Sequence, residues 1–271
     1  MTRVSPFRKP APVVTPMRSG ADFLASIGGD GRRVYCDGEL VADVTTHPFF
    51  RGAAQSIARL YDVAADPANR EVMTFPSPES GAPALRCYQV PKTPGDLAAR
   101  RAMSRRWAEE TFGLMGRTPD HVAGFLAGYA AKPGIFAEGG KQYAENIADY
   151  HAYARDNHLY LSYAIVPPQI DRSKPAHQQS DPTLYAGVVG ERDGGIVLKG
   201  AQQLGTGSVY SDEIYISCIH PLSAGDENYA FAVAVPNNAA GVKIYTRRPY
   251  ASGATSEFDY PLSSRSLTTP A

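Results

Sequence analysis

The sequence lacks most of the features that would place it in a specialised class. It has three cysteines, Cys36, Cys87 and Cys218, which are too few and too widely spaced for a disulfide framework or a zinc site. No apolar run is long enough to cross a bilayer. The formal net charge is +0, from 27 basic and 27 acidic residues, so charge gives no reason to expect nucleic acid or an anionic membrane as a partner. These absences favour a globular protein of the reducing cytoplasm.

Several catalytic motifs are also missing. The sequence has neither GxGxxG nor GxxxxGK[ST], so a Rossmann or P-loop nucleotide site is not expected. Without a Gly-x-Ser-x-Gly elbow, a serine hydrolase is not expected either. The six histidines include no HxxxH pair, and none has a carboxylate at a convincing ligand spacing. We therefore expect no metal site.

The first twenty residues are basic and rich in proline, with no acidic residue before Asp22 and no apolar segment of a secretory signal. We expect residues 1–17 to form a disordered tail, and Met17 could equally be the natural start. The remainder, in a chain with 43% apolar residues, is long enough for one large or two ordinary domains.

Helical spacing dominates the chain up to residue 157. Gly116 is expected to follow the end of one helix, and Thr118 to cap the start of the next with Pro119 in its first turn. A hairpin over 32–44 with an Asp37-Gly38 turn, and a possible strand over 84–90, lie among the helices. The predicted helices are 22–27, 50–64, 96–115, 119–131 and 138–156.

From Leu159 onward the apolar period changes to that of strands. An Asp193-Gly194 turn is expected to join the second and third strands. Helices before strands indicate an α+β class, with a mainly helical domain over 18–157 and a β domain over 158–271. The predicted strands are 159–166, 184–192, 195–203, 213–219, 229–235 and 243–246.

Arg117 and His121 are candidate site residues because they lie where two predicted helices meet. Arg117 is either a surface cation that balances a helix dipole or a permanently charged donor aimed at an anion such as a phenolate. His121 is expected at the third position of its helix, where the dipole disfavours protonation. It is either partly exposed or a neutral imidazole that works within a pocket.

Further candidates follow on the strands. Tyr160 and Tyr163 project to opposite faces of one strand, so one belongs to the core and the other can line a pocket. The run 167–169 ends that strand with two prolines and a glutamine, whose amide suits a heteroaromatic ring. The run 205–208 is glycine-rich, which indicates either a close backbone approach to a ligand or a plain loop.

Three runs carry a resemblance to a known family. They are SRRWAEETFGLMGRTPDH (104–121), ARDNHLYLSYAIVPPQIDRS (154–173) and GTGSVYSDEIYISCIHP (205–221). They resemble the oxygenase component of two-component flavin-dependent phenol monooxygenases, the 4-hydroxyphenylacetate 3-hydroxylase large-component family. Within it the chain is most similar to the chlorophenol and nitrophenol monooxygenase branch. The resemblance extends from Arg18 to about Arg265.

The resemblance implies an acyl-CoA-dehydrogenase-like fold. A helical N-terminal domain would precede a β-barrel middle domain and a C-terminal helical bundle, and full-length members are expected to form homotetramers. In the family the sequence continues well beyond the position of Arg265. We therefore expect this chain to be truncated, with an incomplete barrel and the bundle missing.

The resemblance also implies the chemistry. A separate flavin reductase would supply reduced FAD, which reacts with O2 to form a C4a-hydroperoxide. This hydroperoxide would hydroxylate a phenol, with loss of halide or nitrite in the chlorophenol and nitrophenol branch. The oxygen transfer needs no metal. Family positions imply catalytic roles for Arg117 and His121. The family often has tyrosine where His121 stands and histidine where Tyr163 stands, which suggests a different phenol from 4-hydroxyphenylacetate. Implied substrate contacts are Ser162 and Tyr163, and implied flavin contacts are Val166, Pro168, Gln169 and Thr206.

Other functions stay open at this point. The chain could be a non-catalytic remnant that associates through apolar surface, or a 4-hydroxyphenylacetate 3-monooxygenase. A dehydratase related to acyl-CoA enzymes would need cysteine ligands for an iron–sulfur cluster. The three cysteines of this sequence do not have the clustered spacing of such ligands.

Overall fold

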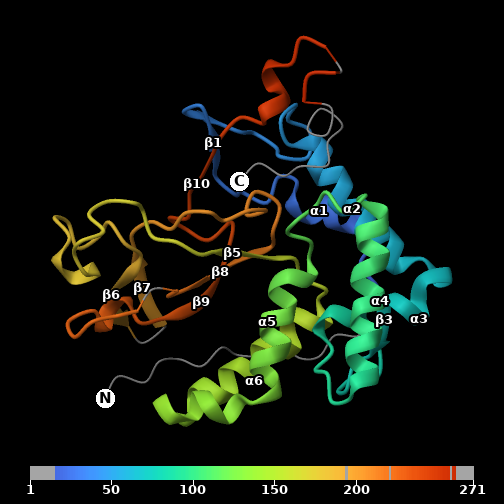
Figure 1. The fold of residues 1–271 in the computed structure, drawn as a ribbon, viewed down its shortest axis with the longest axis horizontal. Coiled ribbons are helices and arrows are strands. Elements are labelled where there is room, and N and C mark those ends of the chain that lie inside the picture. Colours follow the sequence, from blue (N-terminus) through green and yellow to red (C-terminus); the bar gives the residue numbers. More distant parts are fainter. Residues whose placement is uncertain (1–15, 193–194, 220, 257, 261–271) are drawn as a thin grey trace.

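The fold places helices before most of the strands, as the sequence predicts. The structure is a computed structural model that describes residues 16–192, 195–219, 221–256 and 258–260. In Figure 1 the helices gather on one side and the longer strands on the other. The helices are α1 (Gly20–Ile27), α2 (Arg51–Ala65), α3 (Arg70–Met73), α4 (Pro94–Glu110), α5 (Asp120–Ala131) and α6 (Lys141–Asp156).

Two small hairpins lie among the helices. The predicted hairpin with the Asp37-Gly38 turn is confirmed: β1 (Val34–Cys36) pairs antiparallel with β2 (Glu39–Leu40). The second joins β3 (Thr74–Pro76) to β4 (Pro83–Leu85). The strand predicted over 84–90 is wrong beyond Leu85, because the 3₁₀ turn Arg86–Tyr88 follows and buries two of its side chains in the helical core.

The sheet that borders the helices has three strands. β5 (Leu161–Ala164) runs parallel to β8 (Glu213–Ser217), and β8 pairs antiparallel with β9 (Ala232–Pro236). β6 (Gly187–Arg192) and β7 (Gly195–Lys199) form a separate pair, and the predicted Asp193-Gly194 turn between them lies outside the described residues. Single bridges, Val166 to Gln203 and Tyr185 to Ala201, lie beside these strands. Over the described residues the sheets are open.

One further strand returns to the first hairpin. β10 (Ile244–Thr246) pairs in parallel with β1. Figure 1 shows this pair above the main sheet, where a late segment lies beside an early one. Sheet pairing thus crosses the domain boundary expected near residue 157, and that boundary stays a prediction.

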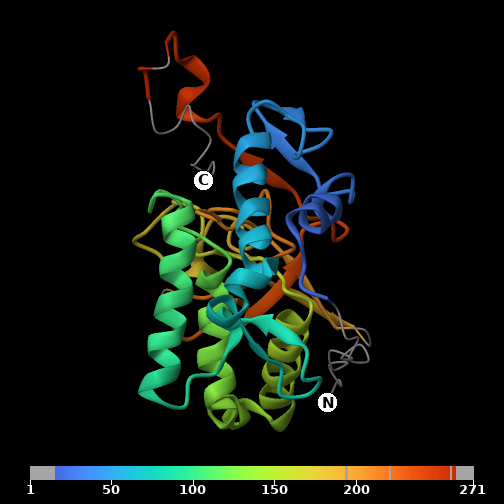
Figure 2. The same ribbon diagram turned by 90° about the vertical axis from the view of Figure 1, so that its right-hand side faces the viewer.

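The helical core is built on α2, which buries one face along its length. Figure 2 shows α2 and α4 as neighbouring columns, and the Trp107 indole of α4 donates a hydrogen bond of 2.9 Å to the Leu60 carbonyl of α2. Met17, expected in the disordered tail, packs against this core. None of the described helices is both long and apolar enough to cross a membrane.

Residues 158–160 connect α6 to β5, and we call this buried segment the crossing. Two of its main-chain carbonyls accept hydrogen bonds from buried tyrosines. The Tyr61 hydroxyl donates to the His158 carbonyl at 2.9 Å, and the Tyr88 hydroxyl donates to the Leu159 carbonyl at 2.8 Å. Both tyrosines are fully buried. Helical core and sheet therefore meet through oriented polar contacts as well as apolar packing.

Asp212 completes the crossing from the side of the sheet. Its carboxylate accepts from the Tyr160 amide at 2.8 Å, and its own amide donates to the Tyr160 carbonyl at 2.8 Å. The carboxylate also forms a two-point ion pair with Arg18 at 2.7 and 2.8 Å. The Arg18 guanidinium lies over the Phe23 and Tyr61 rings. Arg18 thus ties the start of the described chain to the sheet.

Asp212→Ala should destabilise the protein by about 3 kcal/mol, because it leaves a mostly buried guanidinium without its counterion. The side chains of Arg18 and Asp212 are only 11% and 15% exposed. The control is Glu145→Ala, which breaks an exposed Lys141–Glu145 pair and should cost no more than about 0.5 kcal/mol. Urea unfolding measures both, and equal losses would contradict the role given to Asp212.

His158 should make stability depend on pH. Its side chain is buried, and burial, reinforced by the nearby Arg18 charge, lowers its pKa to about 4. An unfolded histidine titrates near pH 6.5, so the unfolded state binds more protons between pH 6.5 and 4. Stability is therefore lost as the pH falls through that window, by about 3 kcal/mol from this group.

The matched variant is His158→Asn, since asparagine tolerates the left-handed φ of +52° at this position and does not titrate. Unfolding free energies measured across the same pH window should fall less steeply in the variant than in the parent protein. Identical slopes would show that His158 is not the group responsible.

Candidate functional site

Arg117 lies in a segment between α4 and α5 that is longer than predicted. The helix expected to run to Met115 ends at Glu110, and Gly116 is not its terminating glycine. The residue that turns left-handed directly after the helix is Phe112, with a φ of +53°, and the Gly113 amide donates to the Ala108 carbonyl at 2.8 Å. Gly113 continues this turn with a φ of +70°, which glycine adopts at low cost, so the chain leaves α4 there and residues 111–119 form the segment that carries Arg117.

The start of α5 is shifted by one residue from the prediction. The helix begins at Asp120 after Pro119, and Thr118 makes no capping bond to the helix amides. The Thr118 hydroxyl donates to the Asp120 carboxylate instead. His121 is therefore the second helical residue rather than the third, still within the first turn.

Arg117 and His121 contact each other directly. Nη1 of Arg117 lies 2.5 Å from Nε2 of His121. Burial lowers the pKa of His121, the Arg117 charge lowers it further, and Asp120 opposes both effects. The imidazole is therefore neutral near pH 7 and accepts a hydrogen bond from the guanidinium. The two residues form one polar unit with a fixed positive charge, partly open to solvent.

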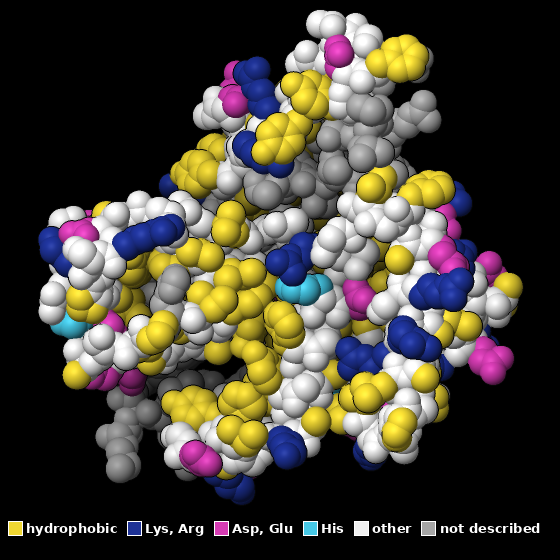
Figure 3. Space-filling view, viewed as in Figure 1, with side chains coloured by type: hydrophobic (Ala, Val, Ile, Leu, Met, Phe, Trp, Pro, Cys, Tyr) yellow, Lys and Arg dark blue, Asp and Glu magenta, His cyan; other side chains and the backbone are white. Residues whose placement is uncertain are grey.

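An aromatic row extends from this unit along α5. His121, Phe125 and Tyr129 follow at intervals of four and face the sheet. The ring centroids of His121 and Phe125 are 4.8 Å apart, and those of Phe125 and Tyr163 are 5.7 Å apart. Figure 3 shows a histidine and a basic side chain beside a broad hydrophobic surface, near the level where α5 begins. Such a surface suits one face of an apolar ring.

Tyr163 continues this row on the sheet. Its ring lies 5.4 Å from that of Tyr215, and its hydroxyl lies 2.6 Å from the Ser217 hydroxyl. Tyr160, by contrast, is buried, so the predicted division of the two tyrosines between pocket wall and core agrees with their burial. Sequence reasoning missed Phe125, Tyr129 and Ser217, although the aromatic spacing along 121–129 was a visible signal.

Ser162 does not share this surface. It is 3% exposed, and its hydroxyl lies 2.9 Å from both the Ser208 and the Ser211 hydroxyls. Neighbouring residues of a strand point to opposite faces, so Ser162 faces inward where Tyr163 faces α5. The Ser162 hydroxyl is therefore bonded internally to residues 208 and 211, and its expected contact with substrate stays a prediction.

The expected flavin contacts lie on two adjoining segments. Val166 and Gln203 exchange main-chain hydrogen bonds of 2.6 and 3.3 Å, which brings the end of the β5 segment beside the run that leads to Thr206. Thr206 and Pro168 are half-buried, and Gln169 is exposed. The structure thus brings Val166 beside the segment that leads to Thr206, and within the described part of the chain no hydrogen bond joins the four expected flavin contacts to Arg117 or His121.

The Gly205–Ser208 turn makes a close contact of another kind. Gly207 has a φ of +85°, and a Cβ there would lie 2.2 Å from the Tyr160 hydroxyl. That hydroxyl donates a hydrogen bond of 2.8 Å to the Arg117 carbonyl. The glycine is therefore needed for packing against Tyr160, and through Tyr160 the turn adjoins the arginine.

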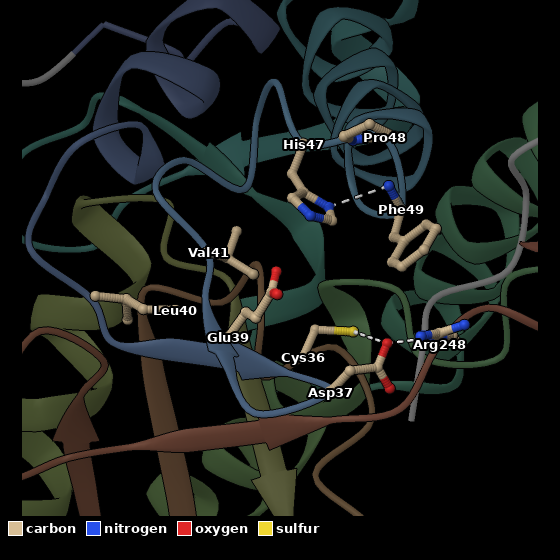
Figure 4. A pocket seen from close by; sticks show the side chains of 9 residues that line it. All are labelled: Cys36, Asp37, Glu39, Leu40, Val41, His47, Pro48, Phe49 and Arg248. Atoms are coloured by element: carbon tan, nitrogen blue, oxygen red, sulfur yellow. Dashed lines mark hydrogen bonds and ion pairs between the residues drawn. The ribbon is translucent and has the colours of Figure 1, made fainter.

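A separate cavity of about 390 Å³ lies elsewhere, between the first hairpin and the start of α2. Figure 4 shows Cys36, Asp37 and Arg248 on one side of it and His47 with Phe49 on the other. It contains none of the predicted site residues. Within the described ranges, no cluster of three or more histidine, cysteine or acidic side chains is placed to hold a metal.

Comparison with known proteins supplies the family. The profile described as 4-hydroxyphenylacetate 3-hydroxylase N terminal matches residues 19–269. The 4-hydroxyphenylacetate 3-monooxygenase oxygenase component of Thermus thermophilus is 38% identical over 92% of this chain and 50% of its own length. The 4-nitrophenol 2-monooxygenase oxygenase component of a Rhodococcus species is 36% identical over 93% of this chain and 47% of its own. The chain spans about half the length of these relatives.

A solved structure of a related oxygenase component supports the same family. The oxygenase component of 4-hydroxyphenylacetate 3-monooxygenase, complexed with FAD and 4-hydroxyphenylacetate, superposes with a TM-score of 0.82 at 37% identity, over 93% of this chain and 52% of that one. The predicted α+β, acyl-CoA-dehydrogenase-like fold is confirmed, with the chain covering about half of its relatives. The chain belongs to the 4-hydroxyphenylacetate 3-hydroxylase N-terminal family.

Proposed function

We propose that this chain contributes the Arg117–His121 side of a site in which reduced FAD hydroxylates a phenol. The observation that carries the proposal is the contact between a permanent cation and a neutral imidazole at the end of an aromatic row. A phenol has both matching parts: an oxygen that becomes anionic and an apolar ring. The relatives' names, which refer to phenol monooxygenases, support the same reaction class.

The residues of the chain fit a flavin in one testable respect. Gln202 Oε1 is buried and has no hydrogen-bond partner among the described residues. It precedes Gln203, which is bridged to Val166, so it lies on the segment to which the family positions assign flavin contacts. A buried acceptor without a donor is costly, and a bound group with N–H or O–H donors would satisfy it. Val166, Pro168, Gln169 and Thr206 would hold the ring.

When bound, the flavin supplies the reaction with oxygen and the transfer of an oxygen atom. The protein residues handle charge and orientation. His121 is neutral, so Nε2 can take the phenol proton. That step frees the Arg117 donors now directed at Nε2, and the guanidinium can then pair with the phenolate. Phe125 and Tyr163 would pack against the ring and limit access of water.

The partners follow from the same proposal. A separate flavin reductase would deliver reduced FAD by diffusion, and O2 and a phenol would be the other substrates. His121 and Tyr163 favour a phenol other than 4-hydroxyphenylacetate, with chlorophenols and 4-nitrophenol as the first candidates. We further propose a cytoplasmic location and a homotetramer for the full-length form.

Reduced FAD should bind the purified chain in an anaerobic titration, and air should then convert a phenol to its hydroxylated product. The panel is phenol, 4-nitrophenol, chlorophenols and 4-hydroxyphenylacetate, with products identified by chromatography and released halide or nitrite assayed. A folded chain that binds no reduced FAD would count against the proposal for this chain.

Arg117→Ala should reduce hydroxylation by roughly 100-fold or more, because a charge-stabilising donor is lost in a partly buried site. Its melting temperature should change little, since the side chain is partly exposed. Arg105→Ala is the matched control: this arginine lies on α4 with its side chain 79% exposed. Unchanged turnover in Arg117→Ala, or an equal loss in the control, would remove Arg117 from the site.

A further inference from the structure

Three buried tyrosine hydroxyls donate hydrogen bonds to main-chain carbonyls. One of the three bonds to a different part of the chain from the other two. Tyr61 and Tyr88 bond to the crossing at residues 158–159. Tyr160, which is 1% exposed, bonds to the carbonyl of Arg117, 43 residues earlier in the chain. The first two bonds join core elements, whereas the third reaches the candidate site.

The segment that receives the Tyr160 bond is otherwise weakly held. Before it, the Leu114 amide bonds to Thr111, and after it, the His121 amide bonds to Thr118. For the main chain of residues 115–117, the Tyr160 hydroxyl supplies the one hydrogen bond found in the described part of the protein. The main-chain position of Arg117 thus depends on this hydrogen bond together with the packing of the buried Met115 and Pro119 on either side.

Tyr160 itself is held from several sides. Asp212 bonds both its amide and its carbonyl, which fixes the backbone. Gly207 lies against its hydroxyl so closely that an added Cβ would overlap it at 2.2 Å. The hydroxyl therefore has little room to move away from the Arg117 carbonyl, and it stands between that carbonyl and the turn that carries Thr206.

We infer that Tyr160 is a positioning residue: its hydroxyl, wedged between Gly207 and the Arg117 carbonyl, sets where the Arg117 guanidinium lies relative to His121 and to the flavin-facing turn. The importance of this position for catalysis rests on the proposed function. The contacts that set the position of the guanidinium involve only Tyr160, Gly207, Arg117 and His121, so they can be tested without flavin or phenol.

The measured quantity is the pKa of His121, obtained from an NMR titration of its imidazole in the full chain. The charged groups that act on this ring are Arg117, which lowers its pKa, and Asp120, which raises it. Arg117→Gln should raise the pKa, because a neighbouring cation is removed. Tyr160→Phe keeps the ring but releases the carbonyl, so the guanidinium should move and the pKa should rise in the same direction by a smaller amount. His121→Gln identifies the resonance.

Tyr88→Phe is the matched control. It removes a hydroxyl that is equally buried and bonded to a carbonyl at the same 2.8 Å, but one that does not touch the Arg117 segment. It should lower the melting temperature about as much as Tyr160→Phe and leave the His121 titration unchanged. A folded Tyr160→Phe with the parent His121 pKa would overturn the inference, as would an equal shift in Tyr88→Phe.

The result of the His121 titration can be distinguished from the result of the phenol hydroxylation assay. If Tyr160→Phe shifts the His121 titration but the parent chain hydroxylates no phenol, the positioning role stands and the proposed function fails. If the parent chain hydroxylates a phenol but Tyr160→Phe leaves the titration unchanged, only the role of Tyr160 is overturned.

Discussion

The structure depends on satisfying the buried backbone at residues 158–160. At this crossing the chain leaves α6 for the sheet. The His158 and Leu159 amides still bond to carbonyls in the last turn of α6, but the three carbonyls of the crossing and the Tyr160 amide have no partner in that helix or in β5. Tyr61, Tyr88 and Asp212 supply the missing partners. A buried polar group without a partner costs more than a hydrogen bond contributes, so these contacts constrain the elements that bear them. Helices and sheet are thereby fixed in one relative position.

The relative position of helices and sheet determines which side chains face the candidate site. From the fixed crossing, strand alternation sends Ser162 inward to the serines at 208 and 211 and turns Tyr163 toward α5. The α5 helix presents His121 and Phe125 to the same region. The site is thus assembled from residues that need no strained geometry of their own, because the crossing orients the strand and the segment 111–119 delivers the arginine.

The order of elements and the candidate residues could be predicted from sequence because both depend on local patterns. Helical spacing gave α2 and α6, and alternation separated Tyr160 from Tyr163. The end of α4 could not be predicted so well: Gly116 carries the usual signal of a helix end, but the residue that turns left-handed after the helix is Phe112, which no local pattern marks. The inward direction of Ser162 was likewise hidden, since its serine partners are more than forty residues away.

The parallel pairing of β1 with β10 has a consequence for how the chain folds. The two strands are about two hundred residues apart, so during synthesis the first hairpin emerges long before its partner exists. Contacts of such high sequence separation form late and slow folding, because a long loop must be closed first. Until then the outer edge of β1 is an unpaired strand edge. A ribosome-bound or partly folded chain would therefore expose residues 34–36 as an edge open to pairing with another chain.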